Sequence, residues 1–125
     1  MSHLVDFDDQ PIIDVWGQLV RARRIEGQRV TVALVELAPD ADVPGHVHEA
    51  EQLGVCLTGS IRFTIGDEVR ELGPGGTWRI PSNVHHQATA GPAGAVVIDV
   101  FAPTRSDWDT LPSHPASPAS WPGRG

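Results

Sequence analysis

Residues 44–52 read Pro-Gly-His-Val-His-Glu-Ala-Glu-Gln, and this segment distinguishes the chain from an ordinary β protein. Side chains alternate between the two faces of an extended strand, so His46 and His48 are expected to project to the same side. Their imidazoles would then lie close enough to bind one ion, and Gln52 has the same parity along the strand. The segment therefore predicts three neutral donors on one face of a strand.

A second group of histidines lies downstream, where Pro-Ser-Asn at 81–83 predicts a turn before a new strand. Adjacent strand residues face opposite ways, so only one of His85 and His86 can join the first pair. A single histidine is more often a surface or core imidazole than a ligand, but four of the six histidines fall in these two short groups. A His-x-His pair on a strand is a known arrangement for binding a divalent cation, so the sequence favours an open metal site.

The composition limits the classes of protein to which the chain can belong. Its 125 residues suit one domain with a true core and are too few for two. No long apolar run is present, so we expect neither a membrane span nor a signal peptide. The net charge of -7 argues against a nucleic-acid partner. All nine basic residues are arginine and there is no tyrosine, which excludes a lysine Schiff base and proton transfer by a tyrosine.

Two further features favour structural roles over chemical ones. Cys56 is the single cysteine, so an internal disulfide is excluded and a reducing, cytoplasmic compartment is expected. It has the parity of Gln52, which predicts a small buried thiol rather than a nucleophile. Arg21, Arg23 and Arg24 form a basic run that we expect to be a solvated strand face rather than an anion site.

Short β-branched and aliphatic segments separated by Gly/Pro turns predict an all-β sandwich or barrel. No segment has helical periodicity of adequate length, and residues 107–111 could form at most one turn. The strands are expected at residues 12–16, 18–25, 29–37, 46–52, 52–63 with a bend at 58–60, 69–72, 77–80, 85–90 and 95–101.

The end of the chain differs from the rest in composition. We expect one domain over residues 1–111 and a Pro-rich tail over residues 112–125, because four prolines and few apolar residues make an independent fold implausible. Trp121 is expected to anchor the tail to a surface. His114 has no neighbours with donor atoms, so we expect a solvated side chain rather than a ligand.

At this point the motifs resemble those of a known family. The pattern Pro-x-His-x-His-x-x-x-Gln at 44–52, followed by Gly59, Gly75 and Pro-x-x-x-x-His at 81–86, resembles the paired motifs of the cupins over roughly residues 30–101. The resemblance implies a jelly-roll barrel, also called a double-stranded β-helix, with a metal in its mouth. It implies the ligands His46, His48, Gln52 and His86, since the motif offset favours His86 over His85.

Two positions depart from the cupin pattern. Gln52 stands where many cupins carry Glu, and Asn83 replaces a common Gly, which Asn can do because it also accepts a left-handed backbone. Four neutral donors would leave the full charge of a divalent ion on the site and make it a strong Lewis acid. These donors suit Fe, Ni, Zn, Mn or Cu, and the sequence does not select among them.

A second group of candidate residues lies in the segment 97–105. Asp99 and Phe101 share a strand face, and Arg105 follows. An interior carboxylate is costly, so Asp99 should be paired, hydrogen-bonded or functional. One interpretation is a structural ion pair between Asp99 and Arg105 at the barrel mouth.

Together with Gln ligation, this segment is similar to the small pectin-degradation cupins of the KdgF type, which open unsaturated uronate rings into linear keto sugars. The resemblance implies that Asp99 shuttles protons, that Arg105 binds the substrate carboxylate and that Phe101 forms an apolar wall. Trp78 is a candidate for a further wall. The substrate would be a uronate or another small acid.

Three alternatives remain open at this stage. The first is a metal-dependent dioxygenase and the second is a polyketide cyclase, which a wide apolar cavity without an inward Arg105 would favour. The third is a non-catalytic cupin that binds a small molecule. We also expect a homodimer, because residues 52–57 are apolar or small on both faces and Val96, Ile98 and Val100 are aliphatic.

Overall fold

The structure of the protein is a computed structural model that describes residues 2–124. No helix among these residues is long and apolar enough to span a membrane. In chain order the elements are η1 (Phe7–Asp9), β1 (Ile12–Asp14), β2 (Val20–Glu26), β3 (Thr31–Leu37), β4 (Asp42–His46), β5 (Glu51–Ile65), β6 (Glu68–Leu72), β7 (Thr77–Ile80), β8 (His86–Ala102), η2 (Ser106–Thr110) and β9 (Ser113–His114). The all-β prediction is therefore confirmed.

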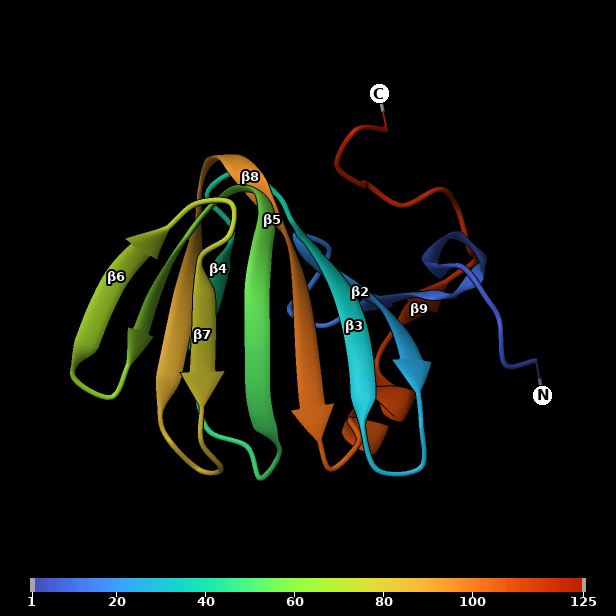
Figure 1. Cartoon of the computed structure of the whole chain (residues 1–125), viewed down its shortest axis with the longest axis horizontal. Helices are drawn as coiled ribbons and strands as arrows, with labels where there is room; N and C mark the ends of the chain where they lie inside the picture. The colour runs from blue at the N-terminus through green and yellow to red at the C-terminus, as the bar shows by residue number, and fades with distance from the viewer. Residues whose placement is uncertain (1, 125) are drawn as a thin grey trace.

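The two longest strands, β5 and β8, pair with each other and each contributes to both halves of the barrel. The first half runs in the order β7-β5-β8-β3-β2-β1-β9, and Figure 1 shows the strands from β7 to β2 side by side. In the second half, the start of β8 pairs with β4 on one side and with the end of β5 on the other, and β6 pairs with β5. This antiparallel arrangement is the predicted jelly roll.

The sequence predicted a bend at 58–60 within one strand and a connection at 91–94 between two strands, and the second of these expectations was wrong. Both strands continue through these positions, with register shifts at Cys56/Thr58 and Gly59/Ile61. Gly59 has a φ of 75°, and a Cβ on it would lie 2.0 Å from the carbonyl oxygen of Gly94. The two glycines thus let the strands pass close together and bend from one half of the barrel to the other without ending.

The core fills the space between the two halves, and it is built from the inward-facing residues of the long strands and their neighbours. Cys56 is 1% exposed, as predicted, and burial raises the pKa of its thiol. The buried cluster includes Ile13, Val20, Ala22, Ala33, Val35, Leu37, Cys56, Ile61, Phe63, Trp78, Ile80, Ala88, Ala90, Val97 and Phe101.

The arginine run on β2 is not uniformly solvated, which corrects the sequence prediction. Arg23 is 3% exposed because the C-terminal tail covers it. Its Nε donates a hydrogen bond to Oε1 of Glu36 at 3.0 Å, and its terminal nitrogens donate to the carbonyl oxygens of Ser117 and Pro118. A buried guanidinium is tolerated here because its donors are satisfied.

The tail lies along its own barrel, and two expectations about it were wrong. Ala119 is 6% exposed whereas Trp121 is 43% exposed, so the small residue is the buried one and Trp121 is not the anchor. His114 is not a free solvated side chain, because it lies in β9, which pairs with β1, and its Nε2 is 2.8 Å from Oδ2 of Asp14.

Two carboxyl groups near the N-terminus fasten the tail. Asp8 accepts hydrogen bonds from the backbone N–H of Ala119 and from Arg124, each at 2.7 Å. These bonds lower the pKa of the Asp8 carboxyl, and the hydrogen bond with His114 lowers the pKa of Asp14. Because both pKa values fall on folding, the stability that these groups contribute is present above the ordinary value of 3.8 and is lost as the pH falls through the folded-state values.

Removal of residues 112–125 is therefore expected to lower the Tm at neutral pH, because Arg23 loses two carbonyl acceptors and both carboxyl groups lose their tail partners. The Tm difference between the full-length and shortened chains should shrink as the pH falls below the ordinary carboxyl pKa. Thermal unfolding of both chains over a pH series measures this difference. A difference that stayed constant from neutral to strongly acidic pH would contradict the assignment of Asp8 and Asp14.

Candidate metal centre

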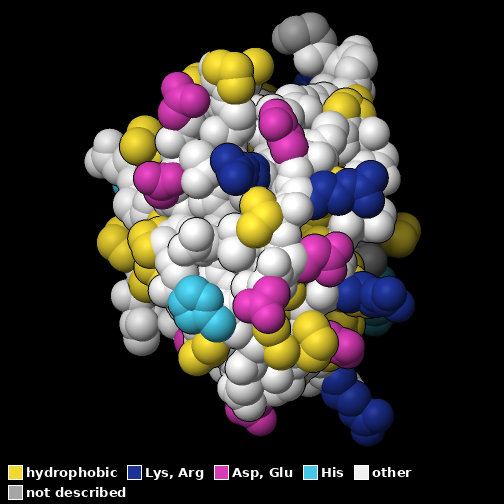
Figure 2. Space-filling view, turned by 90° about the vertical axis from the view of Figure 1, so that its left-hand side faces the viewer, with side chains coloured by type: hydrophobic (Ala, Val, Ile, Leu, Met, Phe, Trp, Pro, Cys, Tyr) yellow, Lys and Arg dark blue, Asp and Glu magenta, His cyan; other side chains and the backbone are white. Residues whose placement is uncertain are grey.

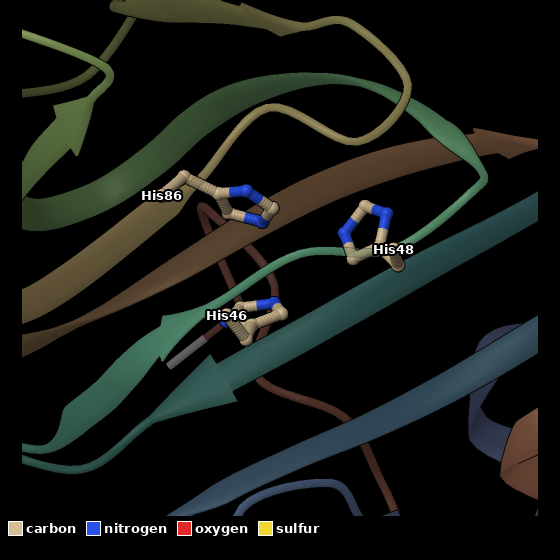
Figure 3. A group of neighbouring side chains, drawn as sticks. All are labelled: His46, His48 and His86. Atoms are coloured by element: carbon tan, nitrogen blue, oxygen red, sulfur yellow. The ribbon is translucent and has the colours of Figure 1, made fainter.

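Three histidine side chains, two from the segment 46–48 and one from the start of β8, lie close together and form a cluster (Figure 3). His46 ends β4 and His86 begins β8, and the two are cross-strand neighbours. His48 lies in the connection between β4 and β5. One ring nitrogen from each residue lies within 4.8 Å of the others, which is close enough for a single ion.

His48 lies in a loop and not on the predicted strand. Strand alternation does not bring His46 and His48 together, because β4 ends at His46 and residues 47–50 form a loop. The loop is held instead by hydrogen bonds. The Nδ1 of His48 lies 2.7 Å from the carbonyl oxygen of Ala50, and the backbone N–H of Asn83 donates to the carbonyl of His48 at 2.9 Å. Asn83 has the expected left-handed backbone, with a φ of 61°.

All three imidazoles are oriented by the same kind of contact. The Nδ1 atoms lie 2.7–2.9 Å from main-chain carbonyl oxygens, with Pro44 facing His46 and Val84 facing His86. A carbonyl oxygen only accepts hydrogen bonds, so each Nδ1 must carry the proton. In a neutral ring the lone pair is then on Nε2, which is the nitrogen that remains for a metal.

In the described part of the chain, the Nε2 atoms of His48 and His86 have no hydrogen-bond donor that suits a neutral ring. Within residues 2–124, Nε2 of His86 is buried without a hydrogen-bond partner. The Nε2 of His48 lies 3.1 Å from Oε1 of Gln52, so two acceptors face each other in the neutral form. Burial lowers the pKa of all three histidines, that of His86 to about 4, which keeps the rings neutral. Three lone pairs and a carboxamide oxygen without a donor fit a divalent transition metal.

The carboxamide of Gln52 has a second contact that the sequence did not reveal. Its Nε2 donates a hydrogen bond to Oδ1 of Asp99 at 2.9 Å, and the same oxygen accepts a bond from Nε1 of Trp78 at 2.8 Å. Asp99 is buried, and burial raises the pKa of its carboxyl to about 6 although both hydrogen bonds act in the opposite direction. The carboxyl can therefore gain or lose a proton close to neutral pH.

A cavity adjoins the cluster and contains most of the residues predicted for the site. Its polar wall includes His46, Gln52, His86, Asp99 and Arg105, and the rest of the lining is mainly aliphatic and aromatic. Phe101 also lines the cavity. Two predicted residues, His48 and Trp78, are absent from the lining, whereas Trp16 and Trp108 line it without having been predicted.

Arg105 is held at the cavity by aromatic rings and by a neighbouring carboxylate. Its Nε and Nη2 donate to the two oxygens of Asp107, each at 3.0 Å. The guanidinium carbon lies 4.7 Å from the ring centre of Phe101 and 4.8 Å from that of Trp108. Since Arg105 pairs with Asp107, the ion pair between Asp99 and Arg105 considered from the sequence is not formed.

Sequence reasoning missed Asp107, Trp108 and Gly54. The first two follow Arg105 directly, and an aromatic and an acidic residue that close to an arginine are a signal for stacking and pairing. Gly54 lies between Trp78 and Asp99 on the neighbouring strands. Nothing in the local sequence marks this glycine, because its role depends on residues 24 and 45 positions away.

Replacement of His86 by Ala is expected to weaken binding of a divalent transition metal by at least about 100-fold, since even the partners that orient a ligand are worth roughly 10–100-fold. His85→Ala is the matched control, because His85 is the exposed neighbour and lies outside the cluster. Elemental analysis of the purified variants and the rise of Tm on metal addition measure the effect. Equal metal content in the two variants would contradict the assignment.

Comparison with known proteins agrees with this geometry. The chain is similar to an RmlC-like cupin from Shewanella frigidimarina, with 21% identity over 86% of this chain and 96% of that one and a TM-score of 0.78. It is similar to KdgF from Halomonas sp., with 25% identity over 86% of this chain and 97% of that one and a TM-score of 0.75. A tryptophan-to-tyrosine variant of oxalate decarboxylase from Bacillus subtilis has 23% identity and a TM-score of 0.70, over 82% of this chain and 31% of that one.

No curated protein sequence matches the chain. The model of the cupin domain family matches residues 33–101, which is more than half of the sequence. The match contains all three clustered histidines, the carboxamide beside them and the buried carboxylate. The protein therefore belongs to the cupin domain family.

Proposed function

We propose that the protein is a metal-dependent isomerase that converts cyclic unsaturated uronates into linear keto sugars. The observation that carries this proposal is the arrangement of Asp99 and Arg105 in a cavity that is also lined by Gln52 and by two histidines of the cluster. A protonatable carboxyl, a cationic group and a cation site in one cavity suit an acidic sugar. The likeness to KdgF, which extends over nearly the whole of that protein, supports this substrate class.

The proposed cofactor is one divalent transition metal bound by His46, His48, Gln52 and His86. When bound, such an ion polarises substrate oxygens as a Lewis acid, and neutral ligands leave its full charge available for this. Fe, Ni, Zn, Mn and Cu all accept these donors. A Bacillus subtilis oxalate decarboxylase similar in fold is described as having Mn(II) centres, which makes Mn a useful first ion to test.

Asp99 is the proposed proton carrier. Conversion of an unsaturated ring to a linear ketone requires a proton to leave a hydroxyl oxygen and a proton to reach carbon, with no net change in composition. A carboxyl with a pKa of about 6 can accept and return a proton at neutral pH. Its Oδ1 already accepts hydrogen bonds from Gln52 and Trp78, so Oδ2 is the oxygen assigned to proton transfer in this proposal.

Arg105 is the proposed binding group for the substrate carboxylate. Asp107 occupies only its Nε and Nη2, and a guanidinium has five N–H donors, so further donors remain for an anion. Phe101 and Trp108 hold the guanidinium plane and offer apolar walls to a sugar ring. An arginine that lines the cavity also argues against the polyketide cyclase alternative.

An unsaturated monouronate incubated with the metal-loaded protein is expected to lose the ultraviolet absorbance of its double bond. Asp99→Ala should lower kcat by about 10²–10⁴-fold, which is the usual contribution of general acid–base catalysis. Arg105→Lys should mainly raise KM, because lysine keeps the charge but loses the planar fork. Both effects are measured from initial rates.

The uronate proposal fails if the metal-loaded wild type leaves the absorbance unchanged, or if Asp99→Ala and Arg105→Ala turn over substrate as fast as the wild type. Oxygen uptake with a phenolic compound would instead support the dioxygenase alternative. Binding of a small acid without turnover would support the non-catalytic alternative.

We also propose a homodimer formed through the outer face of the β5–β8 region. The outward side chains there are aliphatic across neighbouring strands, with Leu53 opposite Val100 and Val55 opposite Ile98. Leu53 is 44% exposed, whereas a monomeric sheet face would normally carry polar residues in such rows. The exposed rim carries both charges, Glu51 and Arg79, so a second copy related by a two-fold axis can bring opposite charges together.

Sedimentation at micromolar concentration should give the mass of two chains, and Leu53→Arg should shift the protein to one chain. Val69→Arg is the matched control, since Val69 is 50% exposed on β6. That side of the molecule, shown in Figure 2, has acidic and basic side chains interspersed with scattered hydrophobic ones. A monomeric wild type, or equal behaviour of the two variants, would contradict the proposed interface.

A further inference from the structure

The carboxylate of Asp99 links the proposed metal ligand Gln52 to the indole of Trp78. Both side chains donate to the same oxygen, Oδ1, at 2.9 and 2.8 Å. We propose that Asp99 and Trp78 act as positioning residues that hold the carboxamide of Gln52 with Oε1 toward the imidazoles and Nε2 away from them. This inference rests on the proposed metal site and adds a role for two residues that lie behind it.

The chemistry of the carboxamide explains why it needs this support. A carboxamide has one acceptor end and one donor end, and the two ends are similar in size, so a rotation of the group exchanges them. Only the Oε1 end can bind a cation. With Oε1 turned away, it would face Oδ1 of Asp99, acceptor against acceptor, while the Nε2 hydrogens would point at the site of the ion. The carboxylate therefore selects the orientation that suits a metal.

Trp78 reaches Asp99 only because residue 54 has no side chain. On β5, Gly54 is the cross-strand neighbour of Trp78 on one side and of Asp99 on the other. A Cβ on Gly54 would lie 2.0 Å from Nε1 of Trp78 and 2.4 Å from Oδ1 of Asp99. The hydrogen bond thus passes directly over the backbone of β5, through a gap that any other residue would close.

The environment of Trp78 separates this role from substrate contact. The side chain is 4% exposed and is absent from the cavity lining. Its ring packs against Phe63, with 4.5 Å between ring centres. A buried indole N–H usually finds an acceptor, but here the acceptor is a charged group that is itself bonded to the candidate ligand. Trp78 can therefore affect the metal only through Asp99 and Gln52.

The decisive measurement is the Kd of Mn²⁺ or Zn²⁺ by calorimetry, with the Tm of the metal-free protein as a check of folding. Trp78→Phe should weaken binding by about 10-fold or more, in the range found for groups that orient a metal ligand. Asp99→Leu should weaken binding more than Trp78→Phe does, and Asp99→Asn should weaken it less than Asp99→Leu, because its Oδ1 still accepts both bonds although the negative charge is lost. The double variant Asp99→Leu/Trp78→Phe should match Asp99→Leu alone, since both act through one carboxamide.

Phe63→Leu is the control for packing, because it disturbs the ring of Trp78 and leaves both hydrogen bonds to Asp99. An equal loss of affinity in Phe63→Leu and Trp78→Phe, or a wild-type Kd in Asp99→Leu, would overturn the positioning role. These results would leave the metal site itself intact, because the wild type would still bind. A wild type that binds neither ion would instead overturn the proposed function together with this inference.

Discussion

Each imidazole of the cluster is fixed by a hydrogen bond from Nδ1 to a main-chain carbonyl two residues away, and the rest of the site depends on this constraint. The rings need no side-chain partner to choose a tautomer, because the local backbone supplies an acceptor that cannot donate. The orientation of the rings therefore depends on the position of the loop backbone rather than on other side chains. The hydrogen bond from the Asn83 N–H to the His48 carbonyl fixes this backbone, because it joins the loop before β5 to the loop before β8.

The hydrogen bond between Gln52 and Asp99 explains why a glutamine suits position 52. A glutamate there would place a second carboxylate against Asp99, whose Oδ1 now accepts a hydrogen bond from the Gln52 amide. Two like charges in a buried site are costly, and one of them would have to be protonated. Gln52 avoids this conflict because it presents an acceptor to the imidazoles and a donor to Asp99. The departure from the usual cupin glutamate and the buried aspartate are thus two parts of one arrangement.

The sequence predicted the fold and the members of the histidine cluster correctly. It did not predict the backbone conformation that brings the histidines together or the continuity of the two long strands. His-x-His spacing and the Pro-x-x-x-x-His motif are local signals, and they identified the three rings although His48 turned out to lie in a loop. Residues 91–94 were predicted to connect two strands because Gly and Pro end most strands, whereas here Gly59 and Gly94 let two long paired strands approach closely and continue. Contacts between distant positions, such as the indole of Trp78 above Gly54, leave no pattern that periodicity can detect.

The tail has a practical consequence for handling the protein. Because Arg124 is bonded to Asp8, the last described residue is fastened to the 3-10 helix η1 near the start of the chain. A fusion partner or affinity tag joined directly after the tail would therefore pull on this ion pair, and a cleavable tag is the safer choice at that end.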